Sequence, residues 1–123
     1  MKRILVVEDV KDINQLISDI LELEGYEVRQ CYNASNAIEL LRSDTAFDLI
    51  ISDVIMPEGD GFDLITFLKA QKLTIPTLVI SGGGIALSST VALDAIKKDT
   101  TAVLHKPIKR QALMDTIQSL LGE

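Results

Sequence analysis

Residues 49–53 read Leu-Ile-Ile-Ser-Asp, an apolar run that ends on a carboxylate, and residues 54–57, Val-Ile-Met-Pro, follow directly. A run of aliphatic residues without alternation is typical of a strand covered on both faces of a sheet. Pro57 then marks a loop. The pattern predicts a buried central strand that delivers Asp53 to its C-terminal tip. A carboxylate at such a tip is costly unless its charge is compensated.

A second run of this kind, Ile-Leu-Val-Val at residues 4–7, ends on Glu8 and Asp9. We expect these two acids to meet Asp53, to hold a divalent cation with it, and to make Asp53 a phosphoryl acceptor. Converging carboxylates repel by about 4 kcal/mol per pair at 4 Å and an effective dielectric near 20. Some of them are therefore protonated, or a cation lies among them. Oxygen ligands without cysteine favour Mg²⁺ as that cation.

The rest of the chain alternates strand and helix patterns five times. Strands are predicted at residues 3–7, 26–32, 47–53, 77–81 and 102–106, and helices begin near residues 12, 33, 62, 88 and 110. Such alternation predicts a parallel sheet with helices on both faces.

Two strand orders, 3-2-1-4-5 and 2-1-3-4-5, are compatible with this pattern. The three acids can form one site only if the first and third strands are neighbours. We therefore expect a doubly wound α/β sheet in the order 2-1-3-4-5. Ligands bind such sheets at the switch point, outside the carboxyl ends of the strands.

Several residues indicate where the helices begin and end. Asp12 is expected to cap the first helix, with Gln15 three residues on, and Asn33 to cap the second. Gly25 is expected to end the first helix. The apolar positions of that first helix follow the spacing of an inward face, and they are Ile13, Leu16, Ile17, Ile20 and Leu21.

Size and composition set further limits. The chain has 123 residues, and we expect one domain over 1–123. A net charge of −6 argues against nucleic acid as a direct ligand. The single cysteine, Cys31, is expected to be a small core residue. No apolar run approaches the length of about 18 residues that a membrane span needs, so we expect no membrane association and a cytoplasmic location.

The last two predicted strands also end on polar residues, Ser81 and Lys106. With these tips, the chain resembles, over its whole length, the receiver domain of two-component response regulators. The resemblance rests on five sets of residues in the same order and at the same spacing, which are Glu8-Asp9, Asp53, Met56-Pro57 with Gly61, Ser81, and Lys106-Pro107.

The resemblance implies a role for each position. Asp53 is the implied nucleophile, which takes a phosphoryl group from a histidine kinase or a histidine phosphotransfer protein. Asp9, Asp53 and the backbone carbonyl of Ile55 are the implied Mg²⁺ ligands, and Glu8 acts through bound water. Ser81 is expected to hydrogen-bond the phosphoryl oxygens. Lys106 is expected to pair first with Asp53 and then with the phosphoryl group.

The family also implies a switch of the surface made by the fourth helix, the fifth strand and the fifth helix, which an unknown downstream protein reads. Many receivers carry Tyr or Phe three residues before the lysine, and this chain has Val103 there. Valine cannot swing a ring between buried and exposed positions. We therefore expect a weaker or different coupling between Ser81 and that surface.

Two other functional classes stay open at this point. One is a flavodoxin-like binder of a flavin or another phosphate ligand, which three acids at the site argue against. The other is an interaction module that never accepts phosphate, which the complete set of tip residues argues against. The residues do not distinguish a stand-alone receiver from one cut from a longer protein.

Overall fold

The computed structural model of the chain describes residues 1–53, 61–81, 102–105 and 107–122. Within these ranges a five-stranded parallel sheet has the order β2-β1-β3-β4-β5, which confirms the predicted doubly wound architecture. The strands are β1 (Arg3–Val7), β2 (Glu27–Cys31), β3 (Leu49–Asp53), β4 (Thr77–Ser81) and β5 (Ala102–His105).

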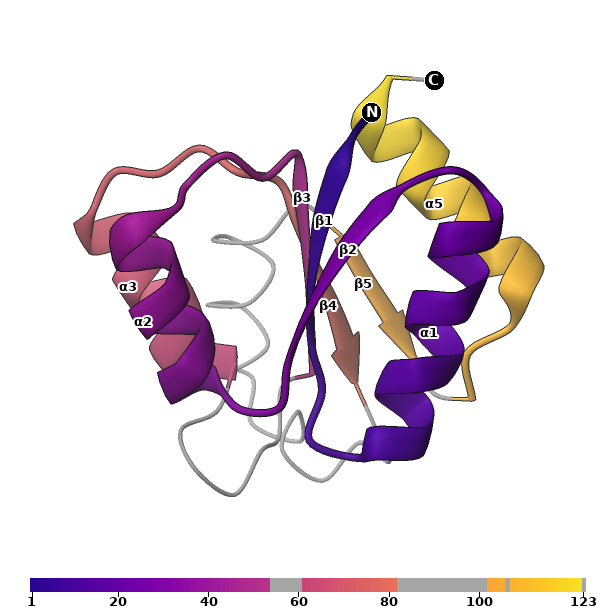
Figure 1. The fold of residues 1–123 in the computed structure, drawn as a ribbon, viewed down its shortest axis with the longest axis horizontal. Coiled ribbons are helices and arrows are strands. Elements are labelled where there is room, and N and C mark those ends of the chain that lie inside the picture. Colours follow the sequence, from indigo (N-terminus) through magenta and orange to yellow (C-terminus); the bar gives the residue numbers. More distant parts are fainter. Residues whose placement is uncertain (54–60, 82–101, 106, 123) are drawn as a thin grey trace.

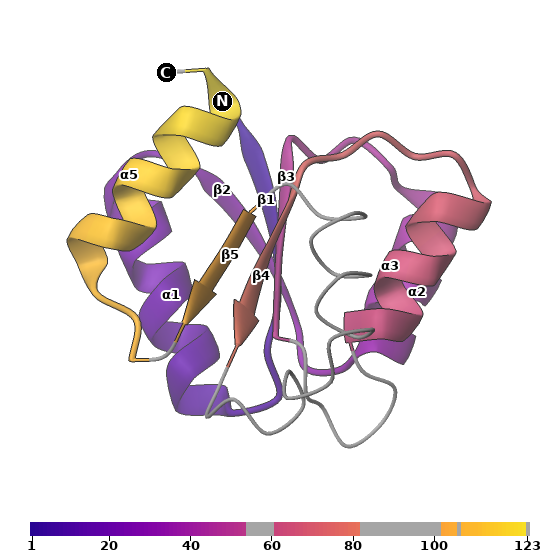
Figure 2. The same cartoon turned by 180° about the vertical axis from the view of Figure 1, so that it is seen from behind.

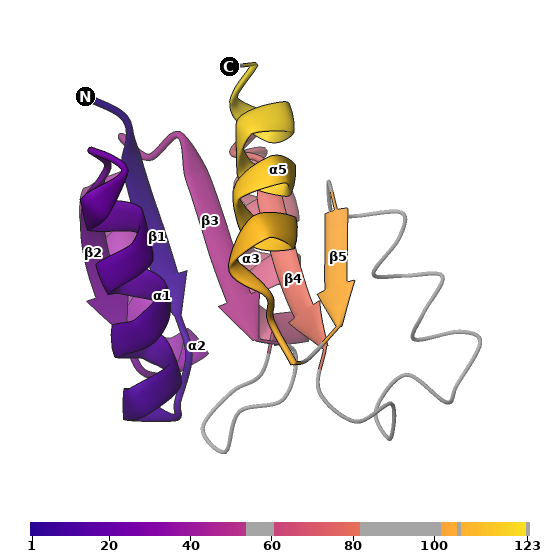
Figure 3. The same cartoon turned by 90° about the vertical axis from the view of Figure 1, so that its right-hand side faces the viewer.

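Helices cover both faces of this sheet. On one face lie α1 (Lys11–Leu23) and α5 (Arg110–Leu121), and on the other lie α2 (Ala34–Ser43) and α3 (Gly61–Ala70) (Figures 1 and 2). All strand arrows point the same way, so the carboxyl ends share one edge (Figure 3). The helix predicted near residue 88 lies outside the described residues.

The core has one layer on each side of the sheet, and β1 contributes to both. Ile4 and Val6 pack with the α1 and α5 side, whereas Leu5 and Val7 pack with the α2 and α3 side. All four are fully buried. Successive side chains of a strand point to opposite faces, so a strand covered on both sides needs apolar residues at every position, as predicted.

Two of the predicted helix boundaries are confirmed. The side chain of Asn33 accepts a hydrogen bond of 2.7 Å from the backbone N–H of Asn36 at the start of α2. Gly25 follows α1 with a φ of +90°, the left-handed region that glycine enters without steric cost.

Two predictions on α1 are wrong. The helix begins at Lys11 after Val10, which makes no side-chain cap, and Asp12 lies within the first turn instead of capping it. A carboxylate there still suits the positive end of the helix dipole. Leu16 is 56% exposed instead of inward. It lines an apolar groove of about 540 Å³ between α1 and the segment of Pro107 and Ile108.

None of the helices in the described part of the chain combines the length and the apolar character that crossing a bilayer requires.

The amino edge of the sheet is held together by Arg3. Its guanidinium contacts Glu27 on β2 at 2.6 Å and Asp44 after α2 at 2.9 Å. It also lies 4.5 Å from the centroid of the Phe47 ring. The backbone N–H of Arg3 donates to Asp48 at 2.8 Å. One side chain therefore joins β1, β2 and the segment that enters β3, at the edge opposite the acids.

Asp44 gives this cluster a pH dependence. The hydrogen bonds from Arg3 hold the pKa of the Asp44 carboxyl below its ordinary value of 3.8. A lowered pKa in the folded state stabilises the protein above pH 3.8, and this contribution is lost as the pH falls through the folded pKa. We predict that Asp44→Asn is less stable than wild type near neutral pH and that the difference shrinks in acid.

Urea unfolding as a function of pH measures this difference. Glu39→Gln is the matched control, because the one ion pair of Glu39 within the described part of the chain is an exposed contact of 3.7 Å with Arg42. A wild type and an Asp44→Asn variant with parallel stability curves through the acid range would show that the Arg3 cluster does not act in this way.

Candidate functional site

The position of Asp53 is fixed by the packing of β3. This strand lies between β1 and β4, with Val7 opposite Ser52 and Ile80 opposite Asp53. All five residues of β3 are buried, and Asp53 itself is only 4% exposed. The sequence places a carboxylate at the last position of the central strand, where water cannot solvate it fully.

Glu8 and Asp9 leave β1 at the same edge of the sheet. Glu8 is 2% exposed and Asp9 is half-buried. The backbone N–H of Glu8 donates to the carbonyl of Cys31 at 3.1 Å, which ties the end of β1 to the end of β2. The backbone N–H of Val10 lies 3.4 Å from Glu8 Oε2 and donates to it. Both acids therefore sit on backbone held by neighbouring elements.

The structure brings the three acids together. One carboxylate oxygen from each of Glu8, Asp9 and Asp53 lies within 4.8 Å of the others. Three carboxylates at this spacing, two of them on buried residues, repel strongly when they are ionised. The set consists of hard oxygen donors only, which is the donor set that Mg²⁺ takes in proteins. The residues present therefore fit the expected ion.

The other predicted site residues are described in part or not at all. Ser81 ends β4, and its backbone pairs with His105 on β5. The structure describes only the backbone of Ser81. Ile55 and Lys106 lie outside the described residues. Their predicted roles stay predictions, as do those of Glu8, Asp9 and Asp53.

One functional candidate was missed by the sequence analysis. Asn14 is fully buried on α1 and donates a hydrogen bond of 3.0 Å to the carbonyl of Glu8. The signal for it was present in the sequence. Asn14, Ser18 and Leu21 share the buried face of α1, so two polar residues interrupt the inward stripe.

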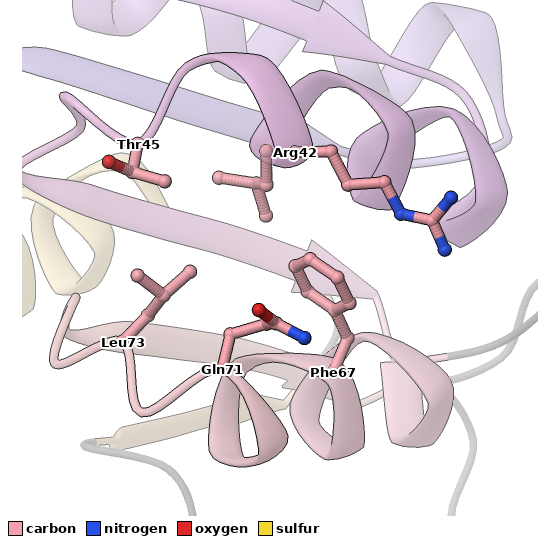
Figure 4. A pocket seen from close by; sticks show the side chains of 6 residues that line it. Arg42, Thr45, Phe67, Gln71 and Leu73 are labelled. Atoms are coloured by element: carbon pink, nitrogen blue, oxygen red, sulfur yellow. The ribbon is translucent and has the colours of Figure 1, made fainter.

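A pocket of about 480 Å³ between α2 and α3 lies away from the acids (Figure 4). Arg42 comes from the last turn of α2, Gln71 directly follows α3, and the Phe67 ring lies between the two helices. In a doubly wound sheet the C-terminal ends of the helices point to the amino edge of the strands. This pocket is therefore not part of the acidic site.

Comparison with known proteins places these features in a family. The family model described as the response regulator receiver domain matches residues 4–118. A probable transcriptional regulatory protein of Picosynechococcus is 36% identical, over 97% of this chain and 49% of that protein. The transcriptional regulatory protein CpxR of Escherichia coli is 30% identical, over 98% of this chain and 50% of CpxR. The chain spans about half the length of these curated relatives.

Solved structures agree with this assignment. A Francisella response regulator receiver domain superposes with a TM-score of 0.85 at 27% identity, over 99% of this chain and 98% of that one. The chemotaxis protein CheY4 of Vibrio cholerae superposes with a TM-score of 0.83 at 30% identity, over 98% of this chain and 99% of that one.

These comparisons also correct one expectation. The absence of a direct nucleic-acid ligand finds no support, because the relatives are named transcriptional regulators and the chain covers only half of their length. The net charge of −6 describes this chain alone. From the family model, the sheet order and the acids at the carboxyl edge, we conclude that the chain belongs to the response regulator receiver domain family of two-component signalling proteins.

Proposed function

We propose that Asp53 accepts a phosphoryl group from a histidine kinase or a histidine phosphotransfer protein in an Mg²⁺-dependent reaction. The observation that carries this proposal is the meeting of three carboxylates within 4.8 Å, with Asp53 buried at the end of the central strand. A cation nearby would stabilise a buried carboxylate that lies beside two others. Phosphoryl transfer needs the same cation, because charge develops on the phosphoryl oxygens.

The chemistry is a displacement at phosphorus. A carboxylate oxygen of Asp53 attacks the phosphorus of a phosphohistidine, a new P–O bond forms and the P–N bond breaks. The electron pair of that bond stays on the imidazole nitrogen of the donor, which takes up a proton. The product is an acyl phosphate on Asp53, and water attacking its phosphorus returns inorganic phosphate and the free carboxylate.

Six residues would support this transfer. Asp9, Asp53 and the backbone carbonyl of Ile55 would hold Mg²⁺, and Glu8 would act through bound water. When bound, the ion supplies positive charge that neutralises the transferred oxygens. Ser81 donates a hydrogen bond to the phosphoryl group, and Lys106 pairs with it. These assignments rest on the resemblance to receivers and on the positions of Glu8, Asp9 and Asp53 in the structure.

Phosphorylation then biases a surface for a downstream protein. We propose that the fourth helix, β5 and α5 form this surface, as in the family. Val103 lies on β5, half-buried and paired with Val79 of β4. With two β-branched residues side by side, this part of the sheet offers no ring that can change position. We therefore expect a weaker or different coupling between Ser81 and that surface. The cytoplasmic location expected from the sequence stays a prediction.

The first prediction of the proposed function concerns the binding of Mg²⁺ by the acids. Mg²⁺ at about a hundred times its Kd should raise the free energy of unfolding of the wild type by about 2.7 kcal/mol. Asp53→Asn should gain clearly less, since it lacks one ligand. Without metal, the same variant should be more stable than wild type, because the repulsion between Asp53 and the two other acids is removed.

Urea unfolding with Mg²⁺ and with a chelator measures both effects. Asp19→Asn is the matched control, because Asp19 is an exposed acid on α1 whose side chain contacts only Gln15 among the hydrogen bonds described. An equal Mg²⁺ gain in wild type and Asp53→Asn would contradict a metal site that includes Asp53.

The second prediction concerns the acceptor itself. Incubation with acetyl phosphate and Mg²⁺ should add the mass of one phosphoryl group to the wild type and to Asp19→Asn. The adduct should be absent from Asp53→Asn and from the wild type with a chelator. Intact mass spectrometry at neutral pH reads this out.

Two negative results separate different failures. A folded wild type that binds Mg²⁺ but gives no adduct with acetyl phosphate or with purified kinases would contradict Asp53 as acceptor. A folded protein that neither binds Mg²⁺ nor gives an adduct would favour a module that binds partners without taking phosphate.

The third prediction concerns Val103. On addition of beryllium fluoride with Mg²⁺, the amide NMR shifts of the wild type should change most at the acidic edge and at Ser81. They should change little at Val103. Val103→Tyr should enlarge the response of β5 and α5, because a ring can move between two positions. Large wild-type shifts centred on Val103 and the fourth helix would refute the weaker coupling.

A further inference from the structure

A buried polar cluster lies directly behind the acids, and the proposed phosphoryl transfer makes no use of it. Its centre is Asn14 in the first turns of α1, which is fully buried. Ser18, one turn further on, is fully buried as well. Buried polar side chains persist only where hydrogen bonds replace their contacts with water. The partners of Asn14 therefore show what the side chain holds.

The donor side of Asn14 joins two backbone segments. Its Nδ2 donates to the carbonyl of Glu8 at 3.0 Å and to the carbonyl of Cys31 at 2.9 Å. The Glu8 carbonyl belongs to the peptide that links Glu8 to Asp9. Fixing this peptide plane fixes the directions in which the two acidic side chains leave the backbone.

The acceptor side of Asn14 is held equally firmly. Its Oδ1 accepts from Gln30 Nε2 at 2.8 Å and from Ser18 Oγ at 3.3 Å. A side-chain amide has two N–H donors and two lone pairs, and here all four are used. The amide is therefore locked between α1 and β2, and it locks the Glu8–Asp9 peptide in turn.

We propose that Asn14 is a positioning residue that preorganises Glu8 and Asp9 for the divalent cation. In the metal-free protein, repulsion from Asp53 pushes the two acids apart, and the bond from Asn14 to the Glu8 carbonyl opposes that movement. Changing a partner that orients a metal ligand in this way typically weakens metal affinity by about tenfold to a hundredfold. The inference rests on the proposed Mg²⁺ site and adds a residue that the sequence analysis did not identify.

The test separates positioning from simple stabilisation. Asn14→Ala and Asn14→Ser remove both donors to the backbone carbonyls. Ser18→Ala removes one buried hydrogen bond to the same amide but leaves those donors in place, so it is the matched control. Urea unfolding gives the stability of each variant, and calorimetric titration with Mg²⁺ gives its Kd, on protein shown to be folded by circular dichroism.

Both Asn14 variants should raise the Kd for Mg²⁺ by about tenfold or more, while Ser18→Ala should lose stability and keep the wild-type Kd. Asn14 variants that bind Mg²⁺ like the wild type would overturn the inference and leave the proposed function intact, as would a Ser18→Ala variant that weakens binding equally. A folded wild type without Mg²⁺ binding would overturn both.

Asn14 variants that stay unfolded even with trimethylamine oxide, which favours compact states, would make Asn14 a determinant of folding. That outcome would also overturn the inference.

Discussion

Mutual repulsion of three carboxylates is the constraint on which the rest of this structure depends. Glu8, Asp9 and Asp53 lie within 4.8 Å of one another, and two of the three are almost fully buried. Flexible chain ends would move such charges apart. Here both acidic segments follow strands in the centre of a sheet, and each strand is packed on both faces. The fold thus keeps charges together that would separate in water, and a divalent cation bound there would relieve the repulsion.

The two edges of the sheet carry different kinds of contacts. At the amino edge, Arg3 joins β1, β2 and the entry to β3 through ion pairs and contact with the Phe47 ring. At the carboxyl edge, the Asn14 side chain on α1 donates hydrogen bonds both to the Glu8 carbonyl and to the Cys31 carbonyl at the end of β2. The amino-edge contacts satisfy opposite charges, whereas the carboxyl edge gathers like charges.

The sheet order could be predicted from the sequence, because Glu8, Asp9 and Asp53 can form one site only if β1 and β3 are neighbours. Caps at Asn33 and Gly25 were also predictable, since each acts on its own chain segment. Asp12 and Leu16 were misassigned because local pattern does not fix the first residue of a helix or which apolar side chain stays uncovered. Asn14 was missed because its partners come from distant segments, and a polar helix residue usually faces water.

The most direct measurement locates the phosphoryl group within the chain. Sodium borohydride reduces an acyl phosphate to an alcohol and would convert a phosphorylated aspartate to homoserine. After phosphorylation, reduction and proteolysis, mass spectrometry should find homoserine at position 53 and at no other acid. Homoserine elsewhere, or a phosphoryl group recovered on His105 instead, would contradict Asp53 as the acceptor around which this account is built.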